Sequence, residues 1–276
     1  PLAEISETVS PIGASIKNMK IEIRKTKEDG IIQITTLDER WYERNGKFVP
    51  SVTWIAGHYP KGIAFYKWLA DKGWDEAEAI KNAAGDRGSK VHQAIDSLIK
   101  EKSVKMDAKF PVDGELQELT PDEYEVVMSF AAWFNETKPE VVKTEFVVWN
   151  EERNYAGTVD LLCKINGELW LIDYKTSQNL WPEHELQVSA YKHAVEGSPK
   201  LGILQVGYRR NKNKWKMNEV EDRFELFLAA QKIWAHETEG VAPKQKDYPR
   251  ELKLDTVKPP KKPRKVKVAV KIKKQK

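Results

Sequence analysis

Two aspartates whose spacing allows them to share a metal ion, Asp160 and Asp173, flank the dipeptide Asn166-Gly167. Asn-Gly favours a two-residue type I′ hairpin turn, and such a turn pairs Ile165 with Glu168 and sets the two aspartates directly opposite each other. Directly opposed residues share a face of the sheet, with Cβ atoms about 4.5–5.5 Å apart. Because two facing carboxylates repel unless a cation lies between them, the spacing predicts a divalent metal ion here.

Lys175 lies two positions after Asp173, and the two-residue period of a strand places both side chains on the same face. Two carboxylates that hold a hard cation beside a lysine are suited to metal-assisted hydrolysis of a phosphodiester bond. The alternative is a solvated hairpin face on which Lys175 only neutralises Asp173. The sequence favours the metal site, because the strand before Asp173 is apolar on both faces, which is typical of a buried central strand. The face away from the carboxylates is expected to carry Val159, Leu161, Cys163, Ile165, Trp170, Ile172 and Tyr174.

A histidine and a glutamate are further candidates for the metal site. His92 lies at the edge of the apolar stripe of a predicted helix. It is either a boundary residue of the core or a metal ligand, and in the second case Asp96, one turn later, is placed to orient its imidazole. Glu145 stands beside an apolar run and is either a third carboxylate of the site or an ordinary strand charge.

Four residues that follow the acidic pair complete the candidates. Gln187 and Tyr191 are four positions apart on a predicted helix, so they share a face, as residues of an ordinary packed helix also do. Thr176 and Ser177 directly follow Lys175, and their hydroxyls either bind a phosphate or serve the next turn.

The ordered set of motifs resembles the PD-(D/E)XK nuclease superfamily, and within it the RecB-like branch. The motifs are Gly88-x-x-x-His92, Gly157-x-x-Asp160, Asp173-x-Lys175 and Gln187-x-x-x-Tyr191. Pro50-Ser51-Val52-Thr53 and the following helix are similar to the mitochondrial genome maintenance exonuclease and related phage exonucleases, so the resemblance covers about residues 48–195. Two features depart from the pattern. Val159 stands where the superfamily name places a proline, and the four-cysteine cluster of some RecB-like relatives is absent.

The resemblance implies a restriction-endonuclease-like core and a Mg²⁺ or Mn²⁺ cofactor. It implies that the side chains of His92, Asp160 and Asp173 hold the metal, assisted by the Tyr174 carbonyl. It further implies that Lys175 is the catalytic lysine.

The same resemblance places Gln187 and Tyr191 on a helix that faces nucleic acid, while Thr176, Ser177 and Glu145 are further binding or supporting candidates. The expected substrate is DNA that is single-stranded or has a free end. The expected activity is that of a metal-dependent DNA exonuclease in recombination, repair or replication, with a recombination or replication protein as partner. The alternatives are a structure-specific or sequence-specific endonuclease on the same fold and a catalytically silent DNA-binding subunit.

The hydrophobic periodicity predicts an α/β (α+β) fold in which helices flank a small mixed sheet. We expect a hairpin over residues 20–36 that turns at Asp29-Gly30, and a second turn at Asn45-Gly46. The predicted helices cover 62–72, 76–101 with a break near Gly85 to Gly88, 121–137, 183–196 and 222–238. The predicted strands cover 141–148, 157–165, 168–175, 202–209 and 213–219. The predicted regions are an N-terminal β-hairpin region (1–47), a nuclease domain (48–240) and a basic, disordered tail (241–276).

Composition narrows the functional classes. The single cysteine, Cys163, excludes disulfide frameworks and cysteine-based zinc or iron–sulfur clusters, and its apolar surroundings predict an inert core residue. No apolar run is long enough to span a bilayer, and no signal-peptide core is found, so we expect a cytoplasmic protein without a membrane partner.

Four aromatic residues either stack on bases or belong to the core, and these are Tyr42, Tyr66, Trp68 and Trp74.

The net charge of +4 comes from the C-terminal end of the chain. Residues 257–276 contain ten Lys or Arg and no acidic residue, and without them 36 basic residues stand against 42 acidic ones, a net charge of −6. Such basic runs are typical of arms that bind nucleic acid, although a solubilising tail is the alternative.

Truncation after Thr256 should flatten the salt dependence of DNA binding. Each phosphate contact contributes about −0.9 to the slope of log K against log salt on duplex DNA, and about −0.7 on single strands. We therefore expect the slope to fall by several units while turnover at saturating DNA hardly changes. Binding titrations of both forms across a salt series measure this, and superimposable slopes would show that the tail does not touch DNA.

Overall fold

The structure is a computed structural model, and it describes residues 22–25, 30–35, 39–112 and 115–238. The chain divides into two units, residues 1–243 and 244–276, and all described residues belong to the first. The predicted basic tail therefore lies outside the described residues. The predicted boundary at residue 48 stays a prediction.

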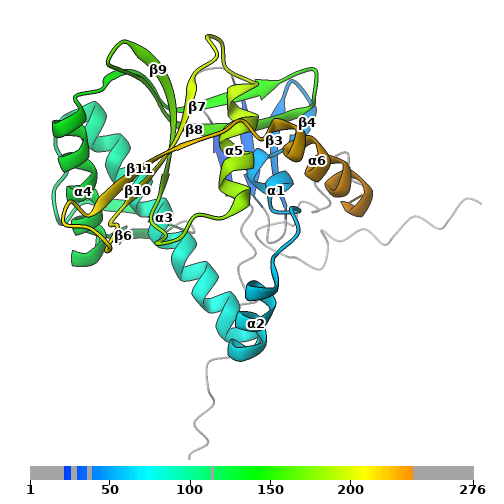
Figure 1. Cartoon of the computed structure of the whole chain (residues 1–276), viewed down its shortest axis with the longest axis horizontal. Coiled ribbons are helices and arrows are strands. Elements are labelled where there is room, and N and C mark those ends of the chain that lie inside the picture. Colours follow the sequence, from blue (N-terminus) through cyan, green and yellow to red (C-terminus); the bar gives the residue numbers. More distant parts are fainter. Residues whose placement is uncertain (1–21, 26–29, 36–38, 113–114, 239–276) are drawn as a thin grey trace, which may run out of the picture. The chain divides into compact units, whose positions relative to one another are not determined.

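A five-stranded sheet forms the centre of this unit, in the order β11-β10-β9-β8-β7 (Figure 1). Strands β9 and β10 are parallel and the other neighbours are antiparallel, which confirms the expected mixed sheet. The strands are β7 (Glu140–Asn150), β8 (Tyr155–Ile165), β9 (Glu168–Lys175), β10 (Lys200–Val206) and β11 (Trp215–Val220).

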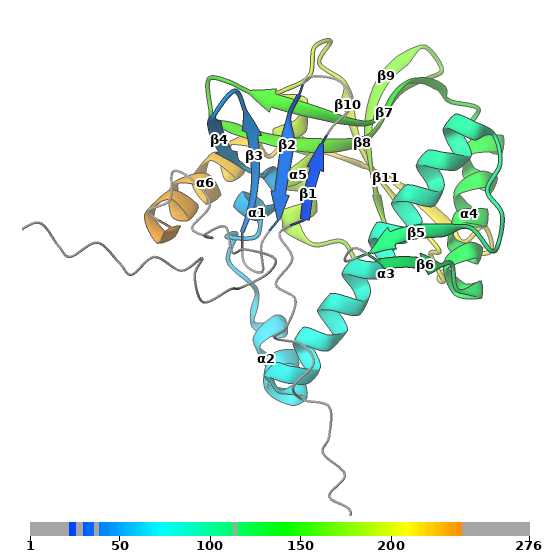
Figure 2. The ribbon, with the colours of Figure 1, turned by 180° about the vertical axis from the view of Figure 1, so that it is seen from behind.

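Helices cover both faces of the sheet, so the expected α/β class is confirmed. One hydrophobic cluster joins the sheet to α1 (Val52–Ala56), α5 (Pro182–Lys192) and α6 (Phe224–Thr238). A second cluster joins the opposite face to α3 (Trp74–Glu101), α4 (Pro121–Thr137) and the ribbon of β5 (Lys109–Val112) and β6 (Glu115–Glu118). Figure 2, seen from behind, shows α3, α4 and this ribbon grouped together.

The β8–β9 hairpin is buried on both sides, as the apolar run before Asp173 predicts. Leu161, Cys163 and Ile172 lie in the second cluster. Leu162 and Leu171, their neighbours along the strands, pack in the first. Val159 departs from the expected face, because it packs in the first cluster. The change of side occurs next to Glu145 of β7, whose backbone φ of +47° interrupts the regular strand.

The two Asn-Gly turns form as predicted. Asn166 and Gly167 have φ angles of 52° and 83°, and Ile165 pairs with Glu168. Asn45 and Gly46 have φ angles of 53° and 78°. Positive φ at both central residues is the requirement of a type I′ turn.

A four-stranded antiparallel sheet at the N-terminal side packs against β8 through its last two strands. Its strands are β1 (Glu22–Lys25), β2 (Ile32–Thr35), β3 (Arg40–Arg44) and β4 (Lys47–Pro50). The predicted hairpin forms, with Lys25 paired with Ile32, whereas a two-residue turn at Asp29-Gly30 would pair Lys25 with Ile34. Asp29 of the predicted turn lies outside the described residues.

Helix α3 is continuous from Trp74 to Glu101, so the predicted break near Gly85 to Gly88 is wrong. A glycine costs a helix about 1 kcal/mol relative to alanine. Packing of the helix against α4 outweighs this cost, and a buried ion pair of 2.8 Å between Lys90 and Glu123 joins the two helices. Helix α5 also differs from prediction, since it ends at Lys192 rather than near residue 196.

Helix α2 (Ile63–Lys72) has no buried residue. It lies beside the N-terminal end of α3, away from the central sheet (Figures 1 and 2). Tyr66 and Trp74 are more than half exposed, whereas Tyr42 is buried and belongs to the core. Tyr42 is therefore excluded from base stacking. None of the described helices is both long and apolar enough to cross a membrane.

Candidate metal-dependent active site

The site lies where β8 and β9 part. Their ladder ends at the pair Leu161–Ile172, one position before the two aspartates, so the predicted direct pairing of Asp160 with Asp173 is not formed in the ladder. Instead the Tyr174 N–H donates to Asp160 Oδ2 at 2.7 Å. From here β8 continues along β7 and β9 continues along β10. A carboxylate thus takes the place of a backbone acceptor at the fork.

His92 of α3 reaches this fork from the second helix layer. Its Nδ1 lies 3.2 Å from Asp160 Oδ1, and its Nε2 lies 3.1 Å from the Tyr174 carbonyl oxygen. Burial alone would lower the pKa of His92, but the carboxylates of Asp160, Glu145 and Asp173 raise it to about 9. The imidazole is therefore held in a strongly negative environment, which equally favours a bound cation.

Glu145 joins His92 and Asp160 from the neighbouring strand. Its two neighbours on β7 pair with the two neighbours of Asp160 on β8, so Glu145 stands level with Asp160. Its φ of +47° is in the left-handed region, which costs a non-glycine residue about 1–3 kcal/mol. Such strain is retained where surrounding structure holds a side chain in a required place.

These donors fit a divalent cation. His92, Glu145 and Asp160 each offer one ligand atom, and the three atoms all lie within 4.8 Å of one another. The Tyr174 carbonyl beside His92 adds an oxygen donor. Mg²⁺ prefers oxygen ligands, and Mn²⁺ also accepts imidazole nitrogen. Asp173 is not part of this compact group, so its ligand role stays a prediction.

Asp173 is instead held by Lys175 and Gln187. Asp173 Oδ2 lies 2.6 Å from Lys175 Nζ, and Asp173 Oδ1 accepts a hydrogen bond of 2.7 Å from Gln187 Nε2. Lys175 also donates to Gln187 Oε1 at 3.1 Å. One amide therefore fixes both members of the Asp-x-Lys motif, and Lys175 lies on the same face as Asp173, as the strand period predicts.

The two carboxylates differ in their electrostatic environments. Burial opposes ionisation of Asp160, but His92, Lys175 and the Tyr174 N–H together hold its pKa below the usual range. Burial raises the pKa of Asp173 to about 6, because the nearby Asp160 charge adds to it and the Lys175 ammonium only partly offsets it. Neighbouring groups whose pKa values are pushed apart are typical of catalytic sites.

Tyr191 connects the Gln-x-x-x-Tyr motif to the Gly-x-x-Asp motif. Its hydroxyl accepts a hydrogen bond of 3.0 Å from Gln187 Nε2, and its ring lies over Gly157. A Cβ atom at Gly157 would come within 2.4 Å of Tyr191 Cε1. Gln187 and Tyr191 are 8% and 2% exposed, so they support Asp173 from within the core.

The remaining sequence candidates lie around this centre. Asp96 does not orient His92, because it accepts hydrogen bonds from Thr144 and Lys100 instead. The Ser177 hydroxyl donates to the Asn179 carbonyl and so serves the turn after β9. Thr176 is half-buried beside it. Cys163 is buried, which raises the pKa of its thiol to about 12, as expected for an inert core residue.

The sequence analysis did not predict the contacts that hold the N-terminal end of α5. Lys61, before α2, forms an ion pair with Glu183 in the first turn of α5. His184, the next residue, accepts a hydrogen bond from the Trp181 N–H. Burial, with Lys175 and Lys61 nearby, lowers the pKa of His184 to about 3, so this imidazole is neutral. No periodicity signals the Lys61–Glu183 contact, because it joins segments far apart in the chain.

Comparison with known proteins gives a match to a protein family. The sequence profile of the PD-(D/E)XK nuclease superfamily matches residues 64–245. No curated protein matches the chain. Among solved structures, the chain is similar to an alkaline exonuclease (LHK-Exo) from Laribacter hongkongensis, at 10% identity and a TM-score of 0.36, over 68% of this chain and 87% of that one.

Substitution of Gln187 by alanine should slow cleavage much more than it weakens DNA binding. Loss of a group that orients metal-site residues typically costs about 10–100-fold in activity. Gln187 is buried, so DNA affinity should hardly change. Single-turnover rates and binding titrations measure the two effects. Gln231→Ala, which removes a hydrogen bond to the Arg153 carbonyl, is the matched control. An unchanged rate in Gln187→Ala would contradict the positioning role.

Substitution of His184 by glutamine should flatten the acid side of the stability profile. The folded pKa of about 3 lies below the usual value of 6.5, so the unfolded state binds a proton that the folded state excludes. This contribution to stability is complete above about pH 6.5 and is lost as the pH falls toward about 3. Urea unfolding of both proteins between about pH 7 and about pH 4.5 measures it. Parallel profiles would contradict a neutral, buried imidazole.

Proposed function

The chain belongs to the PD-(D/E)XK nuclease superfamily, and from this premise we propose that it is a metal-dependent DNA exonuclease. The observation that carries the proposal is the fork of β8 and β9, where His92, Glu145 and Asp160 gather and the Asp173–Lys175 pair lies alongside. This arrangement combines three candidate metal ligands with a nearby lysine, a set suited to metal-assisted phosphodiester hydrolysis.

Each residue has a defined task in this proposal. Asp160, His92 and Glu145 would hold a Mg²⁺ or Mn²⁺ ion, with the Tyr174 carbonyl beside them. When bound, the ion would lower the pKa of an attacking water molecule and would neutralise negative charge on the phosphate. Lys175, held by Asp173 and Gln187, positions the attacking water or stabilises the charge that develops on the phosphate.

Two observations support DNA cleavage over a silent binding role. Asp173 and Lys175 are held by hydrogen bonds with Gln187. Apolar residues at these buried positions would often make the core equally or more stable, so stability alone does not explain the charges. The order of the four motifs supports the RecB-like branch, and with it the exonuclease activity. We further propose a cytoplasmic protein that acts on DNA with a free end or a single strand, with a protein partner of recombination or replication.

Substrate form tests the proposal. The purified protein is incubated with Mg²⁺ and end-labelled linear DNA, and in parallel with covalently closed circles, each single- and double-stranded. An exonuclease degrades the linear forms and spares the circles. Cleavage of closed circles would instead establish an endonuclease, and retarded but uncut DNA would establish a binding subunit.

Lys175→Ala should cost several orders of magnitude in the cleavage rate while DNA affinity stays nearly unchanged. The ammonium lies 2.6 Å from Asp173 at the fork, whereas one lysine among many contributes little to binding. Rapid-quench rates at saturating DNA and a separate binding titration measure the two quantities. Lys164→Ala, an exposed lysine on the same β8–β9 hairpin, is the control. If Lys175→Ala cleaves DNA at the normal rate, the lysine only neutralises the charge of Asp173 and has no catalytic role.

Mg²⁺ should stabilise the fold, and Glu145→Gln should reduce this gain. A ligand at about a hundred times its Kd adds about 2.7 kcal/mol to the free energy of unfolding. Glu145 contributes one of the three clustered ligand atoms, so its neutral substitute should weaken metal binding. Denaturant titrations with and without Mg²⁺ compare the two proteins. If the variant gains as much stability from Mg²⁺ as the wild type, Glu145 is not a ligand.

A further inference from the structure

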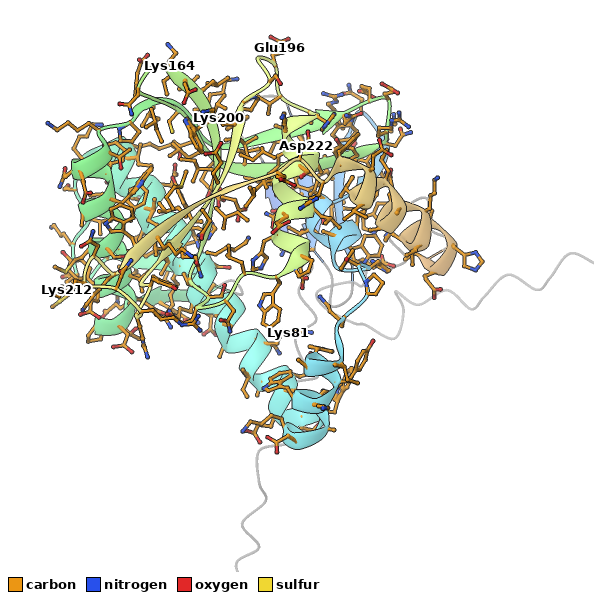
Figure 3. All side chains as sticks on the ribbon, in the orientation of Figure 1. Lys81, Lys164, Glu196, Lys200, Lys212 and Asp222 are labelled. Atoms are coloured by element: carbon orange, nitrogen blue, oxygen red, sulfur yellow. The ribbon has the colours of Figure 1, made fainter. Side chains whose placement is uncertain are left out.

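A polar hollow lies between α3, α4 and the loop that joins β10 to β11. Its volume is about 240 Å³, and its lining includes Arg87, Asp122, Glu125, Gly207, Arg209 and Lys214. We call it the Arg87 hollow. One water molecule takes about 30 Å³ in the liquid, so there is room for a phosphate group and several waters. Figure 3 labels Lys212 in the same loop, at the opposite end of the sheet from Lys164 and Lys200.

The hollow is lined by three basic residues, one more than its acidic residues. Lys214 Nζ lies 2.5 Å from Glu125 Oε1, and Arg209 Nη2 lies 4.0 Å from Asp122 Oδ2. Each carboxylate thus has its own base. Arg87 Nε is shielded from solvent and has no hydrogen-bond partner in the described part of the chain. Among these lining residues, Arg87 therefore keeps one buried guanidinium donor, Nε–H, without a partner.

The floor of the hollow is held in place by specific contacts. Gly207 has a φ of +66°, and a Cβ atom there would come within 2.6 Å of Val126 on α4. The Gly207 N–H donates to Ser129 Oγ at 2.8 Å, and its carbonyl accepts from Gln178 Nε2 at 2.9 Å. Gln178 Oε1 also accepts from the Arg209 N–H at 2.8 Å. The chain therefore passes close over α4, and the hollow is a fixed feature of the fold.

Two stretches of chain tie the Arg87 hollow to the metal site. Gln205 pairs with Lys175 on the parallel strand β9, and Gly207 follows two residues later, about 7 Å further at the usual rise of a strand. Arg87 precedes His92 by five residues on α3, about 7.5 Å along a helix. Each strand of DNA carries one charge per about 3.4 Å of duplex axis. Measured along these two elements, the spacing corresponds to about two nucleotides of a strand.

We propose that the Arg87 hollow binds a phosphate group of the DNA strand, a few nucleotides from the bond that is cut. The proposal rests on the nuclease function proposed above and adds a second anchoring point. The planar guanidinium of Arg87 offers paired donors to phosphate oxygens. Arg209 and Lys214 are largely exposed and line the same hollow, where they offset the charges of Asp122 and Glu125 beside the phosphate.

Oligonucleotides with one neutral linkage test the proposal. In a set of single strands, one phosphate at a time is replaced by an uncharged methylphosphonate, and binding is measured in EDTA so that nothing is cut. The wild type should lose affinity at a particular linkage, and Arg87→Gln should be insensitive to neutralisation of that same linkage. Its salt slope should also be smaller by about 0.7. Arg153→Gln, which removes an exposed arginine on the β7–β8 turn, should keep the wild-type profile.

Arg209→Gln is a second variant, because this exposed arginine can be removed without disturbing the core. It should weaken the response at the same linkage. Oligonucleotides with and without terminal phosphates show whether the bound group is a chain end or an internal linkage. If both variants keep the complete wild-type profile, terminal phosphates included, the proposal is overturned. Failure of the wild type to bind or cut DNA with Mg²⁺ would instead overturn the proposed function.

Discussion

The structure of the site depends on the Asp160 carboxylate, which is only 6% exposed and is shared by three elements. Its two oxygens face His92 of α3 and the Tyr174 N–H of β9, while its backbone belongs to β8. A buried carboxylate is tolerated only when it is paired and hydrogen-bonded. The helix layer and the parting strands are therefore held together by the same charge that the proposed metal site uses.

Much of this site could be predicted from local patterns. The Asn166-Gly167 turn set the hairpin register, and the period of two placed Lys175 beside Asp173. The missing parts depend on tertiary structure. The end of the ladder before Asp160 arises because β8 and β9 follow different partners. The place of Glu145 depends on a single left-handed residue within a strand, which no periodicity signals.

The two motif glycines on α3 and β8 serve different needs. Gly157 is required by packing, since any side chain there would displace the ring of Tyr191 and through it Gln187. Gly88 has open space around its missing Cβ, although alanine would favour the helix by about 1 kcal/mol. The fold alone gives no reason for glycine at this position, one turn before His92. The open space there would leave room for a substrate beside the proposed metal site.

The backbone N–H and carbonyl of Tyr174 contact two of the candidate metal ligands, so their chemical shifts can report on the site. Its N–H is bonded to a carboxylate rather than to a strand carbonyl, and the carbonyl of the same residue faces His92. The shielding of this amide proton therefore varies with the charge on Asp160, and the adjoining carbonyl carbon varies with the state of His92. In a nuclear magnetic resonance spectrum, a single backbone residue would follow occupancy of the centre without a label at any ligand.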